Sequence, residues 1–122
     1  MPQINNIRFQ KFDEFNNIIF IAKPEHELES YDKMHKWYDM LTHKFPESFL
    51  PIYATTEFST IRLRGKIQKF EANATYNIDF NIKHKKSDDG DKSFVNCYLD
   101  GVCLVAKARV IDYGDDVNLE SD

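Results

Sequence analysis

Basic residues alternate along one stretch of the chain, at Arg62, Arg64 and Lys66. In an extended strand, alternate side chains point to the same face, so we expect these three cations to lie in a row. A row of cations can contact successive phosphates of a nucleic-acid backbone, with an affinity that falls as salt rises. Three further bases extend this predicted phosphate-binding set: Lys69, Lys83 and Lys85.

Aromatic residues accompany these bases at Phe58, Phe70 and Tyr98. Rings beside a basic row suit single strands, because each base that stacks on a ring contributes roughly 1–3 kcal/mol. The alternative is that the two phenylalanines pack into the core, as a single aromatic ring more often does. The arginine and lysine side chains would then pair with nearby carboxylates. Those carboxylates are Glu57, Glu71 and Asp79. For the basic row as a group we favour binding, since residues 60–86 carry seven bases and two acids.

The sequence ends in an acidic segment, residues 112–122, that contains no base. Its five carboxylates are Asp112, Asp115, Asp116, Glu120 and Asp122. The segment has a formal charge of −5 against +5 for residues 60–86, a contrast that the overall charge of −4 conceals. This polarity predicts a tail that repels, mimics or competes with a polyanion bound by the basic region. A solubilising end is the alternative.

Residue patterns of common enzymes and metal sites are missing from the sequence. It has no phosphate loop, no Rossmann glycine fingerprint and no nucleophile elbow. His26, His35 and His43 fall on one predicted helix, but at spacings of nine and eight residues rather than the four that a helix-borne zinc site uses. Cys97 and Cys103 are too few for a disulfide framework. We therefore expect a protein that is not an enzyme and that uses no cofactor or metal.

The sequence offers no membrane or export signal. No stretch is apolar over the roughly 18 residues that a membrane-spanning helix needs. Residues 1–6 show no basic segment followed by an apolar one, so no secretory signal is expected. The expected location is the cytoplasm, or the host cytoplasm for a viral protein, with no membrane partner.

One helix is predicted over about residues 25–44. Apolar residues recur there every three or four positions, which places them on one helix face. They are Tyr31, Met34, Tyr38, Leu41 and Phe45. Acids near the start and bases near the end suit the helix dipole, and Pro46 predicts the end of the helix.

The rest of the chain is predicted to be β structure. A hairpin is expected within residues 1–22, with a turn at Asn16-Asn17. Later strands are expected at residues 58–70, with Gly65 as a bulge or bend, and at 75–85, where polar and apolar residues alternate. The last two strands are expected at residues 94–99 and 102–111, on either side of a tight turn at Asp100-Gly101.

These elements predict an α+β fold that is mainly antiparallel β. The uneven, curved strands indicate either a small barrel like the oligonucleotide-binding (OB) fold or a strongly twisted sheet, with one helix. Residues 1–111 form the expected globular domain, and residues 112–122 are expected to form a flexible acidic tail.

The order of these parts resembles the short single-stranded DNA-binding proteins of tailed bacteriophages. The residues that carry the resemblance are the strand Thr60–Lys66, the strand pair Ser93–Ile111 and the acidic segment from Asp112 to Asp116. The entry into the helix at Ile21–Pro24 is also similar. The resemblance implies an OB fold, sequence-tolerant binding of single strands on the barrel face, and a tail that competes for that groove and recruits replication partners.

Two functions of different classes remain open. The first is sequence-tolerant binding of single-stranded DNA or RNA in viral DNA replication or recombination, with the tail contacting replication or host proteins. The second is a small phage or viral protein-interaction module that inhibits or retargets a host protein, its acidic segments mimicking nucleic acid. An exposed positive groove within residues 60–86 favours the first, and internal pairing of these bases favours the second.

Overall fold

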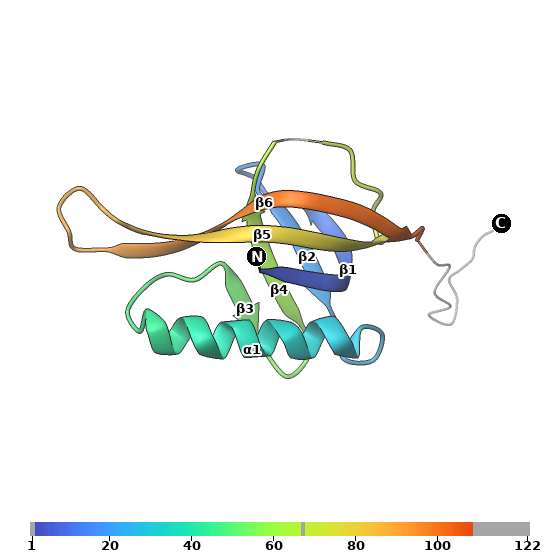
Figure 1. Cartoon of the computed structure of the whole chain (residues 1–122), viewed down its shortest axis with the longest axis horizontal. Coiled ribbons are helices and arrows are strands. Elements are labelled where there is room, and N and C mark those ends of the chain that lie inside the picture. Colours follow the sequence, from blue (N-terminus) through green and yellow to red (C-terminus); the bar gives the residue numbers. More distant parts are fainter. Residues whose placement is uncertain (1, 67, 109–122) are drawn as a thin grey trace.

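The computed structural model describes residues 2–66 and 68–108. Six strands and one helix follow one another along this part of the chain. In order they are β1 (Gln3–Phe12), β2 (Ile18–Ala22), α1 (Leu28–Lys44), β3 (Ile52–Ala54), β4 (Ser59–Arg64), β5 (Thr75–Lys86) and β6 (Ser93–Ala106). Figure 1 shows the strands wrapped around one another, with α1 along one end and the hairpin of β5 and β6 projecting to one side.

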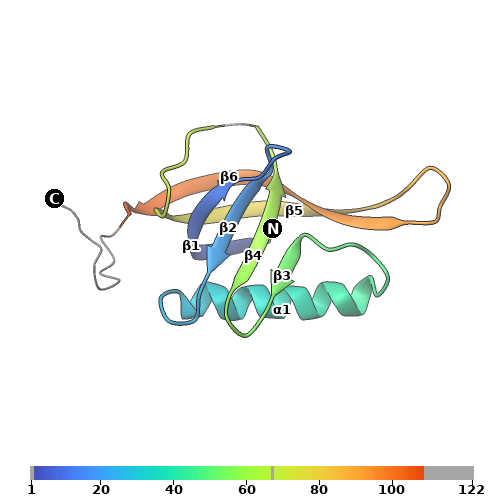
Figure 2. The same cartoon turned by 180° about the vertical axis from the view of Figure 1, so that it is seen from behind.

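Five of these strands close into a barrel. β1 pairs with β2 and β5, β2 also pairs with β4, and β6 joins β4 to β5, so each barrel strand has a partner on both sides. The pairing of β4 with β6 is parallel and the other barrel pairings are antiparallel. Strand β3 pairs with β4 beside the ring, as Figure 2 shows. The predicted α+β fold with an OB-like barrel is confirmed.

Alternate residues of the barrel strands fill its interior, because successive side chains of a strand point to opposite faces. The inward residues of β4, β5 and β6 are Ile61, Leu63, Tyr76, Ile78, Phe80, Val95 and Cys97. The strand predicted at residues 75–85 is thereby confirmed as β5, with its apolar face in the core. On β4 the outward positions belong to Arg62, which is half-buried, and Arg64, which is exposed.

Helix α1 covers one end of the barrel with Met34 and Leu41, which are buried. The other members of the predicted apolar face, Tyr31, Tyr38 and Phe45, are partly buried against the same core. The predicted apolar face and the predicted end of the helix, just before Phe45, are both confirmed. The helix therefore belongs to the core of the barrel and is not an independent appendage.

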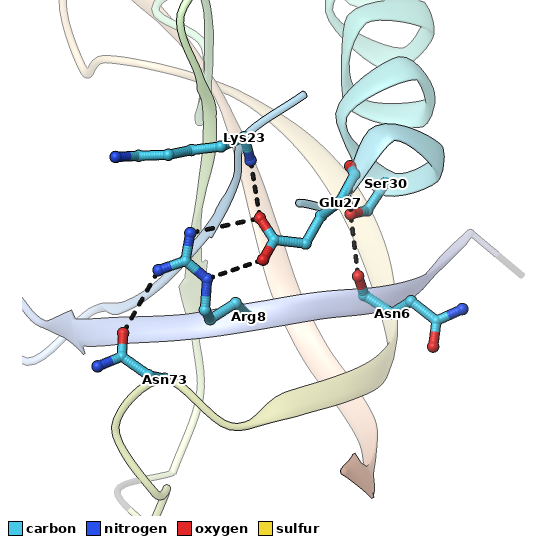
Figure 3. Close-up of polar contacts among 6 residues, drawn as sticks. All are labelled: Asn6, Arg8, Lys23, Glu27, Ser30 and Asn73. Carbon is cyan, nitrogen blue, oxygen red and sulfur yellow. Dashed lines mark hydrogen bonds and ion pairs between the residues drawn. The ribbon is translucent and has the colours of Figure 1, made fainter. Parts of the chain in front are cut away.

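The helix begins at Leu28, so the predicted start at Glu25 is wrong. Glu27 precedes the helix and turns its carboxylate back toward β1 and β2 (Figure 3). It accepts hydrogen bonds from Arg8 Nε at 3.0 Å, Arg8 Nη2 at 3.3 Å and the backbone N–H of Lys23 at 2.9 Å. The Arg8 and Glu27 side chains are only 9% and 7% exposed, and removing one partner of such a pair leaves an uncompensated charge. This ion pair therefore anchors the helix start to β1.

The strand predicted over residues 58–70 is shorter than expected. Strand β4 ends at Arg64, so Gly65 follows the strand and does not bend it. A Cβ at Gly65 would lie 3.3 Å from the Cβ of Leu99, which indicates close packing of the chain against β6 as it leaves β4. Residues beyond Gly65 therefore do not continue the row of outward side chains on β4.

The two strands predicted on either side of Asp100-Gly101 are one continuous strand, β6. Gly101 pairs with Asp79 and Leu99 pairs with Phe80, so Asp100 is an extra residue opposite β5. The feature is a β-bulge, which bends a strand without ending it. The polar Asp-Gly pair that suggested a tight turn thus marks a bend. The predicted end of this strand, residues 109–111, lies outside the described residues.

An aromatic cluster fills the region of the barrel away from α1. The connection from β4 to β5, which arches over that region in Figure 1, brings Phe70 into the cluster. The Phe70 ring stacks on Phe9 with centroids 4.9 Å apart and lies edge-on to Phe20 and Tyr76. Phe70 therefore takes the core position that was considered as the alternative to a binding role.

Candidate nucleic-acid interface

A groove runs over the outer face of β4 and β6, between the β1–β2 turn and the β5–β6 hairpin. Its larger part encloses about 700 Å³ and its smaller part about 370 Å³. Arg64, Phe94 and Asn96 line both parts, which makes the groove one continuous surface. Arg62 lines the larger part, and Lys85 lines the smaller part.

Strand register determines which side chains meet in the groove. Arg64 on β4 pairs with Tyr98 on β6, and on the other flank of β6 Lys83 of β5 pairs with Asn96. Register partners point to the same face of a sheet. The outer face of β6 presents a central row of Phe94, Asn96 and Tyr98. Basic side chains from β4 and β5 therefore flank this row on both sides.

Aromatic rings form part of the groove wall. Phe94 stacks on Phe49 with centroids 5.4 Å apart and an interplanar angle of 23°, and Phe49 remains 56% exposed. The Nζ atom of Lys83 lies 5.4 Å from the centroid of Tyr98. Phe15, in the β1–β2 turn, is 77% exposed. Exposed rings beside cations match the requirements of a surface on which unpaired bases stack.

Within the described part of the chain, the basic side chains of the groove form no ion pair. In residues 2–66 and 68–108, Arg8 forms an ion pair with Glu27, whereas Arg62, Arg64 and Lys85 form no ion pair. The three carboxylates considered as their partners, Glu57, Glu71 and Asp79, do not lie within ion-pair distance of them. In the described residues these cations thus form no ion pair, although the charge of Arg62 acts on the nearby Asp13 carboxylate. Acidic residues occur toward the ends of the groove, at Asp13, Glu14 and Asp88.

Asp13 holds the turn that walls one end of the groove. The Asp13 carboxylate accepts hydrogen bonds from the backbone N–H groups of Phe15 and Asn17, both at 2.9 Å. Slight burial raises the pKa of Asp13, but the hydrogen bonds from Asn17 and Phe15 and the charge of Arg62 outweigh burial and lower this pKa below its ordinary value of 3.8. The predicted hairpin is confirmed here, with Asn16 in its turn at a φ of 63°. An ionised carboxylate therefore shapes this turn at neutral pH.

The structure divides the predicted binding residues into two groups. In or beside the groove lie Arg62, Arg64, Lys83, Lys85 and Tyr98. Four others do not line it. Lys66 and Lys69 are exposed on the connection from β4 to β5, Phe58 contacts Tyr53 with centroids 6.0 Å apart, and Phe70 lies in the aromatic cluster. The early end of β4 explains the positions of Lys66, Lys69 and Phe70, because the outward row stops at Arg64.

The groove residues that were not predicted from the sequence include Phe15, Phe49, Phe94 and Asn96. Phe94 and Asn96 alternate with Tyr98 on one strand, so strand periodicity was a sufficient signal for them. Phe15 also had a signal, as an apolar ring within a polar turn. Phe49 had none, because it reaches the groove through an isolated bridge to Phe94 between distant segments.

Other chemistries gain no support from the described residues. Burial raises the pKa of the Cys97 thiol to about 12, although the charge of Arg62 acts in the opposite direction, so this thiol stays protonated at neutral pH. Within residues 2–66 and 68–108, no group of three or more His, Cys, Asp and Glu side chains could hold a metal ion. The predicted acidic tail, residues 112–122, lies outside the described residues.

The fold and the groove define a small α+β protein with an OB-like barrel and a basic, aromatic outer face. No family model, curated protein or solved structure matches the chain. In the part of the chain that the structure describes, no helix combines the length and the apolar character needed to cross a membrane.

Proposed function

We propose that this protein binds single-stranded nucleic acid in the groove, with little dependence on sequence along most of the strand. The observation that carries the proposal is that arginine and lysine side chains without an ion pair among the described residues lie beside accessible aromatic rings in one groove. Arg62 and Arg64 supply cations from β4, and Phe94 and Tyr98 supply rings from β6. Cations on the backbone and rings under the bases are the two contacts that sequence-tolerant single-strand binding uses.

The loops that border the groove support the same proposal. OB folds bind oligonucleotides on the face of their second and third strands, between the first-to-second and fourth-to-fifth strand loops. The third barrel strand of this chain is β4, which lines the groove through Arg62 and Arg64, and the groove continues over β6, the fifth barrel strand, instead of β2. The corresponding loops are the β1–β2 turn and the β5–β6 loop, and both line the groove through Phe15 and Ser87.

Single strands fit this groove better than duplexes in physical terms. A ring can stack on a base only after the base has left its own stack, which a duplex resists. Within the proposal, binding serves viral DNA replication or recombination, and the acidic tail contacts replication or host proteins in the host cytoplasm. These finer assignments rest on the resemblance to phage single-stranded DNA-binding proteins.

A salt-titrated binding experiment tests the proposal. Fluorescence anisotropy of a labelled mixed-sequence oligonucleotide of about 16 nucleotides, the upper end of the site size of one OB fold, gives the affinity. We expect the single strand to bind more tightly than its duplex, and log K to fall with log salt by about 0.7 for each phosphate neutralised. Absence of binding at low salt, or equal binding of the duplex, would overturn the proposal and leave the protein-interaction module as the better hypothesis.

A further inference from the structure

Asn96 occupies the middle of the groove. It is the polar member of the outward row on β6, between Phe94 and Tyr98, and it lines both parts of the groove. On the neighbouring strand β5, its register partner is Lys83. Its neighbours along β6, Val95 and Cys97, point into the barrel, so the Asn96 side chain belongs to the outer face.

The Asn96 amide has no hydrogen-bond partner among the described residues, although Asn96 is only 9% exposed. Other asparagines of the barrel are engaged: the Asn77 side chain accepts from the N–H of Asn6, and the Asn81 side chain donates to Asp100. A covered amide without a partner costs stability, and such groups in native proteins call for an explanation.

The Asn96 amide is largely buried but remains accessible from the groove. Among the described residues, the side-chain polar atoms that are both fully enclosed and unpaired belong to Trp37, Ser59 and Asn81. Asn96 is not one of these, and it lines the groove, so its amide opens into that space. Among the described residues, the donor and the acceptor of this amide thus have no partner, and the amide lies between Phe94 and Tyr98 on the outer face of β6.

We propose that Asn96 reads the edge of one base, and that the base it prefers is adenine. This inference rests on the proposed function. An asparagine amide presents a donor beside an acceptor and pairs with adenine through N6–H and N7, in two hydrogen bonds. A purine also has a larger ring surface to stack on Phe94 than a pyrimidine. Cations and rings therefore bind the strand independently of its sequence, and the Asn96 amide recognises the base at one position.

Four single strands of equal length test this assignment. Each is a thymidine tract whose central three nucleotides are dA, dC, dG or dT, and each is titrated with the wild-type chain and with Asn96→Leu. The leucine has a similar volume and no amide. We expect the wild type to bind the dA strand about 5-fold to 100-fold more tightly than the dT strand, the discrimination of one bidentate contact. In Asn96→Leu this ratio should fall at least several-fold, to what the larger stacking surface of adenine alone gives, because a leucine side chain can form neither of the two hydrogen bonds.

Each strand is titrated with both proteins, so the base stacking within the free oligonucleotide affects both affinities equally and cancels in their ratio. Asn5→Leu is the matched control, because Asn5 is exposed on β1 and does not line the groove. Asn5→Leu should keep the wild-type ratio, and thermal melting verifies that all three proteins fold. If the wild type binds the four strands equally, or Asn96→Leu keeps the preference for dA, the assignment of Asn96 is overturned while the proposed function stands. If no strand binds, the proposed function itself fails.

Discussion

Arg64 on β4 lies in register with Tyr98 on the parallel strand β6, and the Nζ atom of Lys83 lies 5.4 Å from the Tyr98 ring on the other flank. One aromatic ring is thereby flanked by cations that come from two different strands. A cation beside a ring face strengthens stacking with a polarised base and can contact its phosphate at the same time.

The double variant Arg62→Ala, Arg64→Ala should weaken oligonucleotide binding and flatten its salt dependence. Removal of one phosphate contact reduces the slope of log K against log salt by about 0.7, so removal of two reduces it by about 1.4. The matched control is Lys33→Ala, Lys36→Ala, which removes the same charge from exposed positions on α1. If both double variants lose affinity equally, net charge and not the groove controls binding.

Phe94→Ala should weaken binding by roughly 1–3 kcal/mol, the contribution of one base stacked on one ring. Phe58→Ala should leave the affinity unchanged, because Phe58 contacts Tyr53 and does not line the groove. Anisotropy titrations of the two variants at one salt concentration measure the difference. A larger loss from Phe58→Ala than from Phe94→Ala would mean that the ligand lies elsewhere on the barrel.

A chain truncated after Ile111 should bind single strands more tightly than the full chain at low salt. The removed segment carries five carboxylates, and a tethered polyanion acts at high local concentration without a tight contact. The gain should shrink as salt rises, because the Debye length is about 10 Å at 0.1 M. Equal affinities of the two chains at low salt would show that the tail does not compete for the groove.

Leu41→Ala should lower the free energy of unfolding by about 2–5 kcal/mol, as for deletion of a fully buried leucine side chain. Leu41 is 1% exposed beneath the barrel, whereas its neighbour Met40 is 46% exposed. Met40→Ala should therefore change stability by no more than about 0.5 kcal/mol. Urea denaturation compares the two, and similar effects would place the wrong face of α1 against the core.

The contribution of Asp13 to stability should disappear in acid. Its folded-state pKa lies below the ordinary value of 3.8, because hydrogen bonds from Asn17 and Phe15 and the charge of Arg62 outweigh slight burial. A lowered folded pKa stabilises the fold above the unfolded pKa, and this stabilisation is lost as pH falls through the folded pKa. The difference in urea midpoint between wild type and Asp13→Ala should be constant near neutrality and shrink below about pH 4. A difference that grows in acid would contradict the assigned direction.

Patterns of local spacing were sufficient for much of the fold. The alternation in residues 75–85 identified β5, the three- and four-residue spacing around Met34 identified the buried face of α1, and Asn16 identified the first turn. These features depend on the geometry of a single strand, helix or turn, which neighbouring residues impose directly. The α+β class followed from the order of the elements, whereas the choice between an OB-like barrel and a strongly twisted sheet was decided by the strand pairings that close the barrel.

Boundaries and partners depended on contacts between distant segments. Glu27 reaches Arg8 of β1, and the helix begins after that contact. Asp100-Gly101 has the composition of a turn, yet twelve register pairs with β5 hold β6 together across it, and the extra residue becomes a bulge. Local preference is worth little beside a long ladder of backbone hydrogen bonds, so strand pairing overrode it at Asp100-Gly101.

The amino-acid sequence by itself determined that a basic row, a set of rings and an acidic end exist in this protein. It could not decide which rings stand beside the basic row, because every aromatic side chain gains free energy by leaving water. Barrel closure decided this: Phe70 went into the core, while Phe94 stayed on the outer face beside Arg64. The groove exists because β4 and β6, far apart along the chain, pair in parallel with one register.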